Sequence, residues 1–448
     1  MSRFVRSSKV RHVYVEPAKL EKQYQELRIS LATGDQNYIK ANTKFFAYPV
    51  QTGGGALTVV PLDQVGKLPP CLPVYDGHVG AVLDFDFNPF HEHVIASGGD
   101  DCTVKVWRIP DGGLTQNIMD PLVNMAEHQK KVVVVRFHPT ADSILATGSA
   151  DHTVKIWDAT RGDCRATCEA SRELIQDVVW NYDGSLLASS SKDKILRVID
   201  PRTAKVAGSV LAHDGTKTSK LVFLGPTDRL CSVGFTRTSK RQFKIWDPRQ
   251  LAKPITVTDV DQGSGVIMPF FDEDTNLLFL GGKGDGNIRY YEITDSAPFQ
   301  YHINEFRAAS PARGLALVPK LGCDTSRCEV AKILKLTKNS VEPLSFIVPR
   351  KSEMFQPDLY PDCYAGRPSL SAEEFFAGKN AKPLLTSMDP SKRATVVKKA
   401  PSSAVAFKVS RSAKELEAEL SEYKKYVELL QHRLKENNIA YPPPATVA

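Results

Sequence analysis

Short apolar runs separated by turn residues recur along roughly the first 350 residues of the chain. The runs are of strand length and rich in β-branched and aromatic side chains, as in VKVW at 104–107 and VKIW at 154–157. Runs of this kind, bounded by Gly, Asp, Asn and Pro, are typical of strands in antiparallel sheets. The pattern therefore predicts an all-β domain over residues 1–349, after which prolines and scattered aromatics replace the strand signals.

Two stretches of this domain, 77–107 and 127–157, repeat one another. Each has a His, followed after 19 residues by Ser or Thr, after 4 more by Asp and after 6 more by Trp. A repeat of about 40–50 residues with these residues is the WD repeat, which forms one four-stranded blade of a β-propeller. We interpret each set as a buried hydrogen-bond chain that holds blades together: His78, Ser97, Asp101 and Trp107 in the first, and His128, Thr147, Asp151 and Trp157 in the second.

Ser, His and Asp also make up the catalytic triad of hydrolases. That triad occurs once in a protein, whereas this set occurs twice with the same spacing and ends each time on a Trp. Outside the two sets, the sequence shows no activated nucleophile and no set of metal ligands. We therefore expect these residues to be structural, and we expect no catalytic residues and no enzyme activity.

Three weaker copies of the repeat follow, with closing residues Ile199, Trp246 and Tyr291. One blade without the WD residues precedes the clear repeats, with strands around FFAYPV and ALTVVPL, and another follows the fifth copy. The total is seven blades. Because a propeller must close its ring without an open sheet edge, we expect the strand at 11–15 to complete the last blade.

The remainder of the chain differs from the propeller in composition and in the pattern of its apolar residues. Residues 350–378 contain aromatics and prolines, which indicates an extension packed on the propeller, and residues 379–411 are basic and aperiodic, as in a flexible linker. Residues 412–438 carry apolar side chains at alternating steps of 3 and 4, which predicts an oligomerising α-helical coiled coil, and residues 439–448 form a tail. The seam of the coiled coil contains Leu416, Leu420, Tyr423, Val427, Leu430 and Leu434.

Composition narrows the class of protein. The eight cysteines are scattered without the spacing of a zinc site, so we expect free thiols, no metal and no cofactor. No apolar run reaches the 18 or more residues of a membrane span, and the N-terminus lacks the apolar core of a secretory signal, which together predict a cytoplasmic protein. The acidic triplet at 272–274 lacks the Gly and Glu that a calcium loop requires.

The net charge of +7 is concentrated near the N-terminus and in the linker. These basic stretches contain no interleaved aromatics that would stack on bases, so we expect no nucleic acid partner. An anionic protein surface is favoured, with a weak contact to an anionic membrane as the alternative.

Four stretches carry a resemblance to a known family: RSSKVRHV at 6–13, GKGDGNIRYYEI at 282–293, VPRKSEMFQPDLYPD at 348–362, and the coiled coil. On these stretches the chain resembles a short coronin. The resemblance implies a seven-bladed propeller, binding to actin filaments and control of branched actin assembly, with the actin-related-protein nucleation complex and actin-severing proteins as further partners. It also implies a location in the actin cytoskeleton, at the cell cortex, phagocytic cups or the leading edge.

The resemblance also suggests site residues. Arg28 matches a position associated with filament contact, and Arg6 and Lys9 are neighbouring charges that we expect to add to it. Many members carry a g-position Arg followed five residues later by Glu, which favours trimers, whereas here Asn438 follows Arg433. A homotrimer is favoured, with dimers and tetramers open. The alternative function is a generic WD-repeat scaffold for signalling or trafficking proteins, and actin cosedimentation would separate the two.

Overall fold

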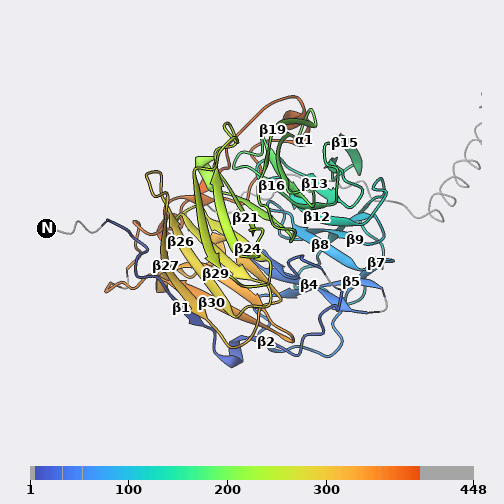
Figure 1. The fold of residues 1–448 in the computed structure, drawn as a ribbon. Coiled ribbons are helices and arrows are strands. Elements are labelled where there is room, and N and C mark those ends of the chain that lie inside the picture. Colours follow the sequence, from blue (N-terminus) through green and yellow to red (C-terminus); the bar gives the residue numbers. More distant parts are fainter. Residues whose placement is uncertain (1–5, 33, 53, 353, 394–448) are drawn as a thin grey trace, which may run out of the picture. The chain divides into compact units, whose positions relative to one another are not determined.

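The computed structural model describes residues 6–32, 34–52, 54–352 and 354–393. Their strands form six four-stranded antiparallel sheets and one six-stranded sheet, together with a small two-stranded sheet (Figure 1). We number the large sheets as blades 1 to 7. Blade 1 contains β3 (Lys40–Ala41), β4 (Phe45–Gln51), β5 (Gly55–Pro61) and β7 (Tyr75–His78), and blade 2 contains β8 (Val82–Phe87), β9 (Val94–Gly99), β10 (Val104–Arg108) and β11 (Val123–Met125).

The next four blades have the same meander order. Blade 3 contains β12 (Val132–Phe137), β13 (Ile144–Ser149), β14 (Val154–Asp158) and β15 (Asp163–Cys168), and blade 4 contains β16 (Ile175–Trp180), β17 (Leu187–Ser191), β18 (Ile195–Asp200) and β19 (Lys205–Leu211). Blade 5 contains β20 (Lys220–Phe223), β21 (Leu230–Phe235), β22 (Arg241–Trp246) and β23 (Thr256–Asp261), and blade 6 contains β24 (Ile267–Asp272), β25 (Leu277–Gly282), β26 (Asn287–Ile293) and β27 (Gln300–Arg307).

The first strands of the blades line the centre and close a ring. In order, β3 contacts β8, then β12, β16, β20, β24 and β28 follow, and β28 (Gly314–Val318) contacts β3 again. The predicted seven-bladed β-propeller is therefore confirmed. The lower face is defined by the turns that join the first and second strands of each blade. The upper face is defined by the turns that join the second and third strands.

Apolar side chains between neighbouring blades form the core. One cluster joins Val104 and Val106 of blade 2 to Val132, Val135 and Trp157 of blade 3. Close approach of the blades requires small residues on the second strands. A Cβ atom added to Gly98 would lie 2.8 Å from a side-chain carbon of Val132 in the next blade, so a larger residue would push the blades apart.

Blade 7 is completed from the other end of the chain. Its own strands are β28, β29 (Glu329–Leu336) and β30 (Ser340–Ile347), and its outer positions are filled by β1 (Tyr14–Pro17), β2 (Tyr24–Gln25) and β6 (Gly66–Lys67) (Figure 1). Tyr14 pairs with Ile347 at one end of β30, and Gln25 pairs with Ser340 at the other. The expected closing strand therefore exists, shifted a few residues towards the C-terminus from 11–15.

A packed extension follows β30 along the lower face. It contains β31 (Cys363–Tyr364), α1 (Ala372–Phe376), β32 (Leu385–Thr386) and α2 (Pro390–Arg393), and β31 pairs with β32. Ser371 and Glu374 form a capping box at the start of α1. The ring of Phe375 meets the edge of His138 in blade 3 at 4.6 Å between centroids.

Residues 379–393, which the sequence analysis assigned to the linker, continue this extension. Leu385 and Thr386 belong to its sheet, and Met388 is only 1% exposed. The packed segment thus reaches Met388. The rest of the linker and the predicted coiled coil lie outside the described residues.

The described part of the chain contains four short 3-10 turns, one between β1 and β2 and three between the first and second strands of blades 5 and 7. They are η1 (Leu20–Lys22), η2 (Gly225–Thr227), η3 (Lys320–Gly322) and η4 (Thr325–Arg327). Among the described residues, no helix is both long and apolar enough to cross a membrane.

The N-terminal closing segment should contribute strongly to stability. A chain lacking residues 1–17 loses β1 and the buried side chains of Val10 and Val13, which are 3% and 1% exposed. Burial of two valines at roughly 1.5–3 kcal/mol each predicts a loss of about 3–6 kcal/mol, measured by thermal or urea denaturation. A chain lacking only residues 1–5 is the control. Equal stability of the two truncated chains would contradict the closing role.

Candidate binding surfaces and the buried polar chains

The two predicted sets form continuous hydrogen-bond chains. In blade 2, Trp107 Nε1 donates to Ser97 Oγ at 2.8 Å, and Ser97 Oγ lies 2.7 Å from His78 Nε2. His78 Nδ1 lies 3.0 Å from an Asp101 carboxylate oxygen. If His78 Nδ1–H donates a hydrogen bond to the carboxylate, Nε2 accepts one from the serine hydroxyl. Every polar hydrogen in this hydrogen-bond chain then has an acceptor.

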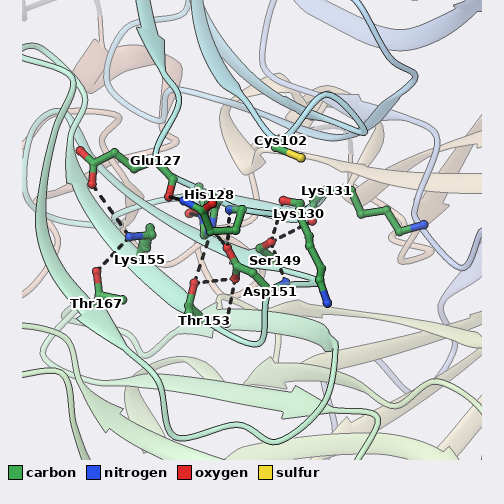
Figure 2. Close-up of polar contacts among 12 residues, drawn as sticks. Cys102, Glu127, His128, Lys130, Lys131, Ser149, Asp151, Thr153, Lys155 and Thr167 are labelled. Atoms are coloured by element: carbon green, nitrogen blue, oxygen red, sulfur yellow. Dashed lines mark hydrogen bonds and ion pairs between the residues drawn. The ribbon is translucent and has the colours of Figure 1, made fainter.

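The second chain, in blade 3, has the same geometry. Trp157 Nε1 donates to Thr147 Oγ1 at 2.8 Å, and Thr147 Oγ1 lies 2.7 Å from His128 Nε2. His128 Nδ1 lies 2.8 Å from Asp151, and Figure 2 shows these two residues together with Thr153. The Asp151 carboxylate also accepts from the backbone N–H groups of Gln129 and Thr153. The histidine, which ends the segment before the blade, is thereby tied to the turn between the second and third strands.

The geometry of these two hydrogen-bond chains indicates a structural role. Ser97 and Thr147 are both 0% exposed, so no substrate can reach either hydroxyl. Burial alone would raise the pKa of Asp101 and Asp151, but the hydrogen bond from the paired histidine and those from Thr103 or Thr153 hold it well below the usual range. Both aspartates therefore stay ionised at neutral pH as fixed acceptors.

A third chain, in blade 5, was only half anticipated by sequence. Trp246 Nε1 donates to Ser232 Oγ at 2.8 Å, and Ser232 Oγ lies 2.9 Å from His213 Nε2. In place of an aspartate, Gln242 Nε2 lies 3.1 Å from His213 Nδ1. The His and Trp were visible in the sequence, but the glutamine lies on β22, after a longer turn, where the repeat pattern gave no signal.

Blades 4 and 6, which lack the His and Trp pair, use ion pairs instead. Asp193 in the turn of blade 4 pairs with Arg197 at 2.6 Å, and Ser189 Oγ is buried without a hydrogen-bond partner among the described residues. In blade 6, Asp285 pairs with Arg241 of blade 5 at 2.6 Å, and Arg241 also binds Asp261 at 2.5 Å. Arg241 therefore bridges blades 5 and 6 where histidine does so elsewhere, whereas the Arg197 pair lies within blade 4.

A belt of alternating charges lines the central channel. Arg136 on β12 lies 2.5 Å from Asp84 on β8 and 3.4 Å from Asp177 on β16. Lys40 on β3 reaches Asp84 at 3.2 Å, and Lys220 on β20 reaches Asp177 at 3.8 Å. The belt therefore links the inner strands of five consecutive blades, from blade 1 to blade 5.

Arg28 lies on the upper face beside the junction of blades 7 and 1. Its neighbours Leu27 and Ile29 are 5% and 4% exposed, whereas Arg28 itself is exposed. Its carbonyl accepts from the backbone N–H of Gln51, and Leu27 N–H donates to Asn339 of blade 7. The backbone is thus held on both sides while the guanidinium points outward, without a hydrogen bond or ion pair to another described residue.

Arg6 and Lys9 lie at the opposite end of blade 7. Since β1 pairs with the end of β30 and β2 with its beginning, the residues before Tyr14 and those after Gln25 are on opposite faces. Arg6 forms an ion pair with Glu292 and lies 4.1 Å from the ring centroid of Tyr301, and Lys9 donates to the carbonyl of Asp358. The structure therefore does not bring the three predicted contact residues together.

The remaining predictions concern metal and oligomer sites. Within the residues that the structure describes, no group of three or more His, Cys, Asp or Glu side chains could hold a metal ion. The predicted oligomerisation residues, from Leu416 to Leu434, lie outside the described part of the chain.

Three family models match five stretches of the chain. The WD domain, G-beta repeat, matches residues 69–108, 119–158 and 162–200, and a further type of WD40 repeat matches 341–383. A domain of unknown function, DUF1899, matches residues 3–67, which contain the closing strands β1 and β2.

Two relatives are similar over most of the chain. Coronin-A of Dictyostelium discoideum is 46% identical over 409 residues, which are 91% of this chain and 90% of that protein. The coronin-like protein crn1 of Schizosaccharomyces pombe is 41% identical over 392 residues, which are 86% of this chain and 65% of that protein.

Solved structures agree with these relatives. The WD40 domain of Toxoplasma gondii coronin superposes with a TM-score of 0.81 at 33% identity, covering 85% of this chain and 98% of that one. A chain of the mitotic checkpoint complex superposes with a TM-score of 0.57 at 15% identity, covering 78% of this chain and 98% of its own length, which indicates a shared fold alone.

The buried chains predict a stability effect with a characteristic pH dependence. Asp151→Ala leaves the His128 Nδ1 group without its partner and should lower the free energy of unfolding by about 1–3 kcal/mol in urea denaturation. Because the pKa of Asp151 is lowered in the folded state, its contribution is present above the unfolded pKa of about 3.9. It is lost as the pH falls further, so the difference from the wild type should shrink below about pH 4.

Asp163→Ala, at an exposed position in the same blade, is the matched control and should unfold like the wild type. Identical unfolding of the Asp151 and Asp163 variants at neutral pH would overturn the structural role of the chain.

Proposed function

Because the chain belongs to the coronin family, we propose that it binds actin filaments through the upper-face surface around Arg28 and links them by self-association. The observation that carries the proposal is the similarity to two coronins over 91% and 86% of the chain. Membership explains why the propeller, the closing segment and the lower-face extension occur together in one chain.

The physical properties of the Arg28 surface suit an acidic partner. Lys67 on β6 pairs with Gln25 on β2, and its side chain is 74% exposed while its ammonium lies 3.0 Å from Glu26 Oε1. The exposed Lys338 precedes the Asn339 carbonyl that holds Leu27. Arg313 donates to the carbonyl of Ser30, which fixes the backbone beyond Arg28. A held backbone with outward-pointing cations reduces the ordering cost of binding and favours an anionic surface.

Self-association supplies the second part of the proposed mechanism. The heptad seam around Leu420 and Val427 would join several propellers, each with one filament site. Once one site is bound, the next sees an effective concentration of about millimolar for a short flexible linker. Avidity can then exceed single-site affinity by about 10²–10⁴. We propose a trimer, with dimers and tetramers as the other outcomes of the measurement.

On the basis of the family relationship we also propose more specific partners. These are the actin-related-protein nucleation complex and actin-severing proteins, reached through the filament, and a weak contact of the basic linker with an anionic membrane. The corresponding location is the actin cytoskeleton at the cell cortex, phagocytic cups or the leading edge.

Charge reversal tests the filament surface. Arg28→Asp should weaken cosedimentation with actin filaments by about tenfold, which corresponds to ~1.4 kcal/mol, with unchanged thermal denaturation. Because the contact is electrostatic and exposed, wild-type binding should also weaken as salt is raised.

Arg249→Asp is the matched control, since this arginine is exposed on the lower face with a side chain that is 82% exposed. Arg6→Ala provides a second comparison and should affect stability more than binding, because Arg6 is held by Glu292. If Arg28→Asp and Arg249→Asp cosediment equally well, the upper-face surface is not the filament site.

Removal of the helix tests crosslinking. A chain lacking residues 412–448 should be monomeric in sedimentation equilibrium, bind filaments about 10²–10⁴ times more weakly and form no bundles. Leu420→Asp combined with Val427→Asp should act in the same way, since both place charges in the seam. Ser421→Asp combined with Lys425→Asp, outside the seam, should leave assembly intact. An oligomeric truncated chain would show that self-association lies elsewhere.

A further inference from the structure

A cavity of about 750 Å³ opens at the lower end of the central channel. All seven inner strands contribute to it, because its walls are the turns that follow β3, β8, β12, β16, β20, β24 and β28. The extension adds a further wall through residues 364–367. A volume of this size fits a small organic ligand or one extended peptide side chain with its backbone.

One side of the cavity is acidic. Asp272, Glu273 and Asp274 form the turn after β24, and all three line the cavity. Asp272 is neutralised by the Lys320 ammonium at 2.6 Å, whereas Asp274 lies 4.0 Å from the same group. Glu273 has no hydrogen bond or ion pair to another described residue. Two carboxylates therefore face the cavity with little compensation from one lysine.

Burial and the neighbouring negative charges raise the pKa values of Glu273 and Asp274. Burial, then the charges of Asp274 and Asp272, raise the pKa of Glu273 to about 7. Burial, then the charge of Asp272, raise the pKa of Asp274 to about 7, against the opposing effect of Lys320. A cation placed between them would offset both effects.

Aromatic side chains surround the same space. Tyr182 after β16 and Tyr364 of the extension line the cavity with Trp180 and Phe271. Burial is the main cause that raises the pKa of Tyr182 and Tyr364, and the negative charge of Glu273 adds to it in both cases. The acidic turn thus acts electrostatically on aromatic rings from blade 4 and from the extension. Carboxylates beside aromatic rings are the combination that recognises organic cations.

An unpaired donor stands on the opposite side. Asn88, in the turn after β8 of blade 2, is 2% exposed and lines the cavity. Its Oδ1 atom accepts from the backbone N–H groups of Phe90 and His91, but its Nδ2 group is buried without a partner among the described residues. Buried amide donors without partners are rare, and this one lies in the cavity wall, where a small movement of the Asn88 side chain would present it to a ligand oxygen.

From this geometry we propose that the lower-face cavity binds an arginine-like ligand, with its guanidinium at Glu273 and Asp274 and a carbonyl or carboxylate oxygen at Asn88. Blades 2 and 6 lie across the ring from one another, so the ligand must carry its cation and its acceptor at opposite ends. Free arginine and an arginine within a peptide share this chemistry. A metal ion does not, because no metal-holding group exists among the described residues.

Calorimetric titration of the full chain with L-arginine tests the proposal, with L-citrulline as the uncharged ligand of the same shape. We expect arginine to bind and citrulline to bind at least about tenfold more weakly, as expected for a lost charged hydrogen-bond pair. A capped Gly-Arg-Gly peptide distinguishes the sources: binding of the peptide assigns the cavity to an arginine side chain, and binding of the amino acid alone assigns it to a free metabolite.

Two variants locate the site. Glu273→Gln and Asp274→Asn should each weaken arginine binding by about tenfold. Each should also raise the melting temperature of the ligand-free protein, because each removes a poorly compensated charge. Asp295→Asn is the control, because Asp295 lies in the same blade, its side chain is 84% exposed and it does not line the cavity.

The pH dependence of the wild type needs no variant. Arginine stays charged, whereas Glu273 and Asp274 lose their protons near pH 7, so affinity should rise by about tenfold or more between pH 6 and pH 8. The other charged or titratable groups that line this side are Asp272, Lys320, Tyr182, Tyr364 and the exposed Arg367. Absence of arginine binding at millimolar concentration, equal binding of citrulline, or unchanged binding in both cavity variants would each overturn the proposal.

Discussion

Closure of the ring is the constraint on which the rest of this structure depends. Each blade buries apolar side chains against two neighbours, so a seven-bladed ring has no blade that can be left incomplete. The outer edge of β30 would be an open strand, and the chain covers it with two pieces of its own N-terminus, β1 on one half and β2 on the other. The first and last strands of the propeller therefore form one sheet, and the segment between β1 and β2 crosses from one face to the other.

Polar groups buried between the blades impose a second requirement, which the chain meets in more than one way. Blades 2 and 3 use His, Ser or Thr, Asp and Trp, and blade 5 replaces the aspartate with Gln242. At the junction of blades 5 and 6, where the next blade lacks histidine and tryptophan, Arg241 forms the bridge between Asp261 and Asp285. Most of the buried donors and acceptors between the blades are satisfied, with Ser189 Oγ as an exception, while the residue types that satisfy them vary.

The two faces of the propeller differ in chemistry because different parts of the chain reach them. The upper face presents Arg28 on a backbone held between blades 7 and 1, which suits a large anionic partner. The lower face is covered by the extension, which with the turns of the blades encloses an acidic and aromatic cavity. Between them, the ion pairs of Arg136 with Asp84 and Asp177 belong to the charged belt of the channel. Because they lie on opposite faces, the proposed filament surface around Arg28 and the proposed ligand cavity around Glu273 would not compete for space.

The sequence by itself determined the local structure: the strands, the hairpins, the two complete polar chains and the number of blades. These follow from patterns within about 50 residues, and such patterns depend on local spacing alone. The tertiary structure decided what distant segments do together. It placed Arg6 and Arg28 on opposite faces because an antiparallel strand pairing separates them, it brought Gln242 to His213, and it buried residues up to Met388 in an extension that composition had suggested was linker. The acidic turn at 272–274 gained its meaning only when seven blades and the extension met around it, because burial and electrostatic context are properties of the assembled ring.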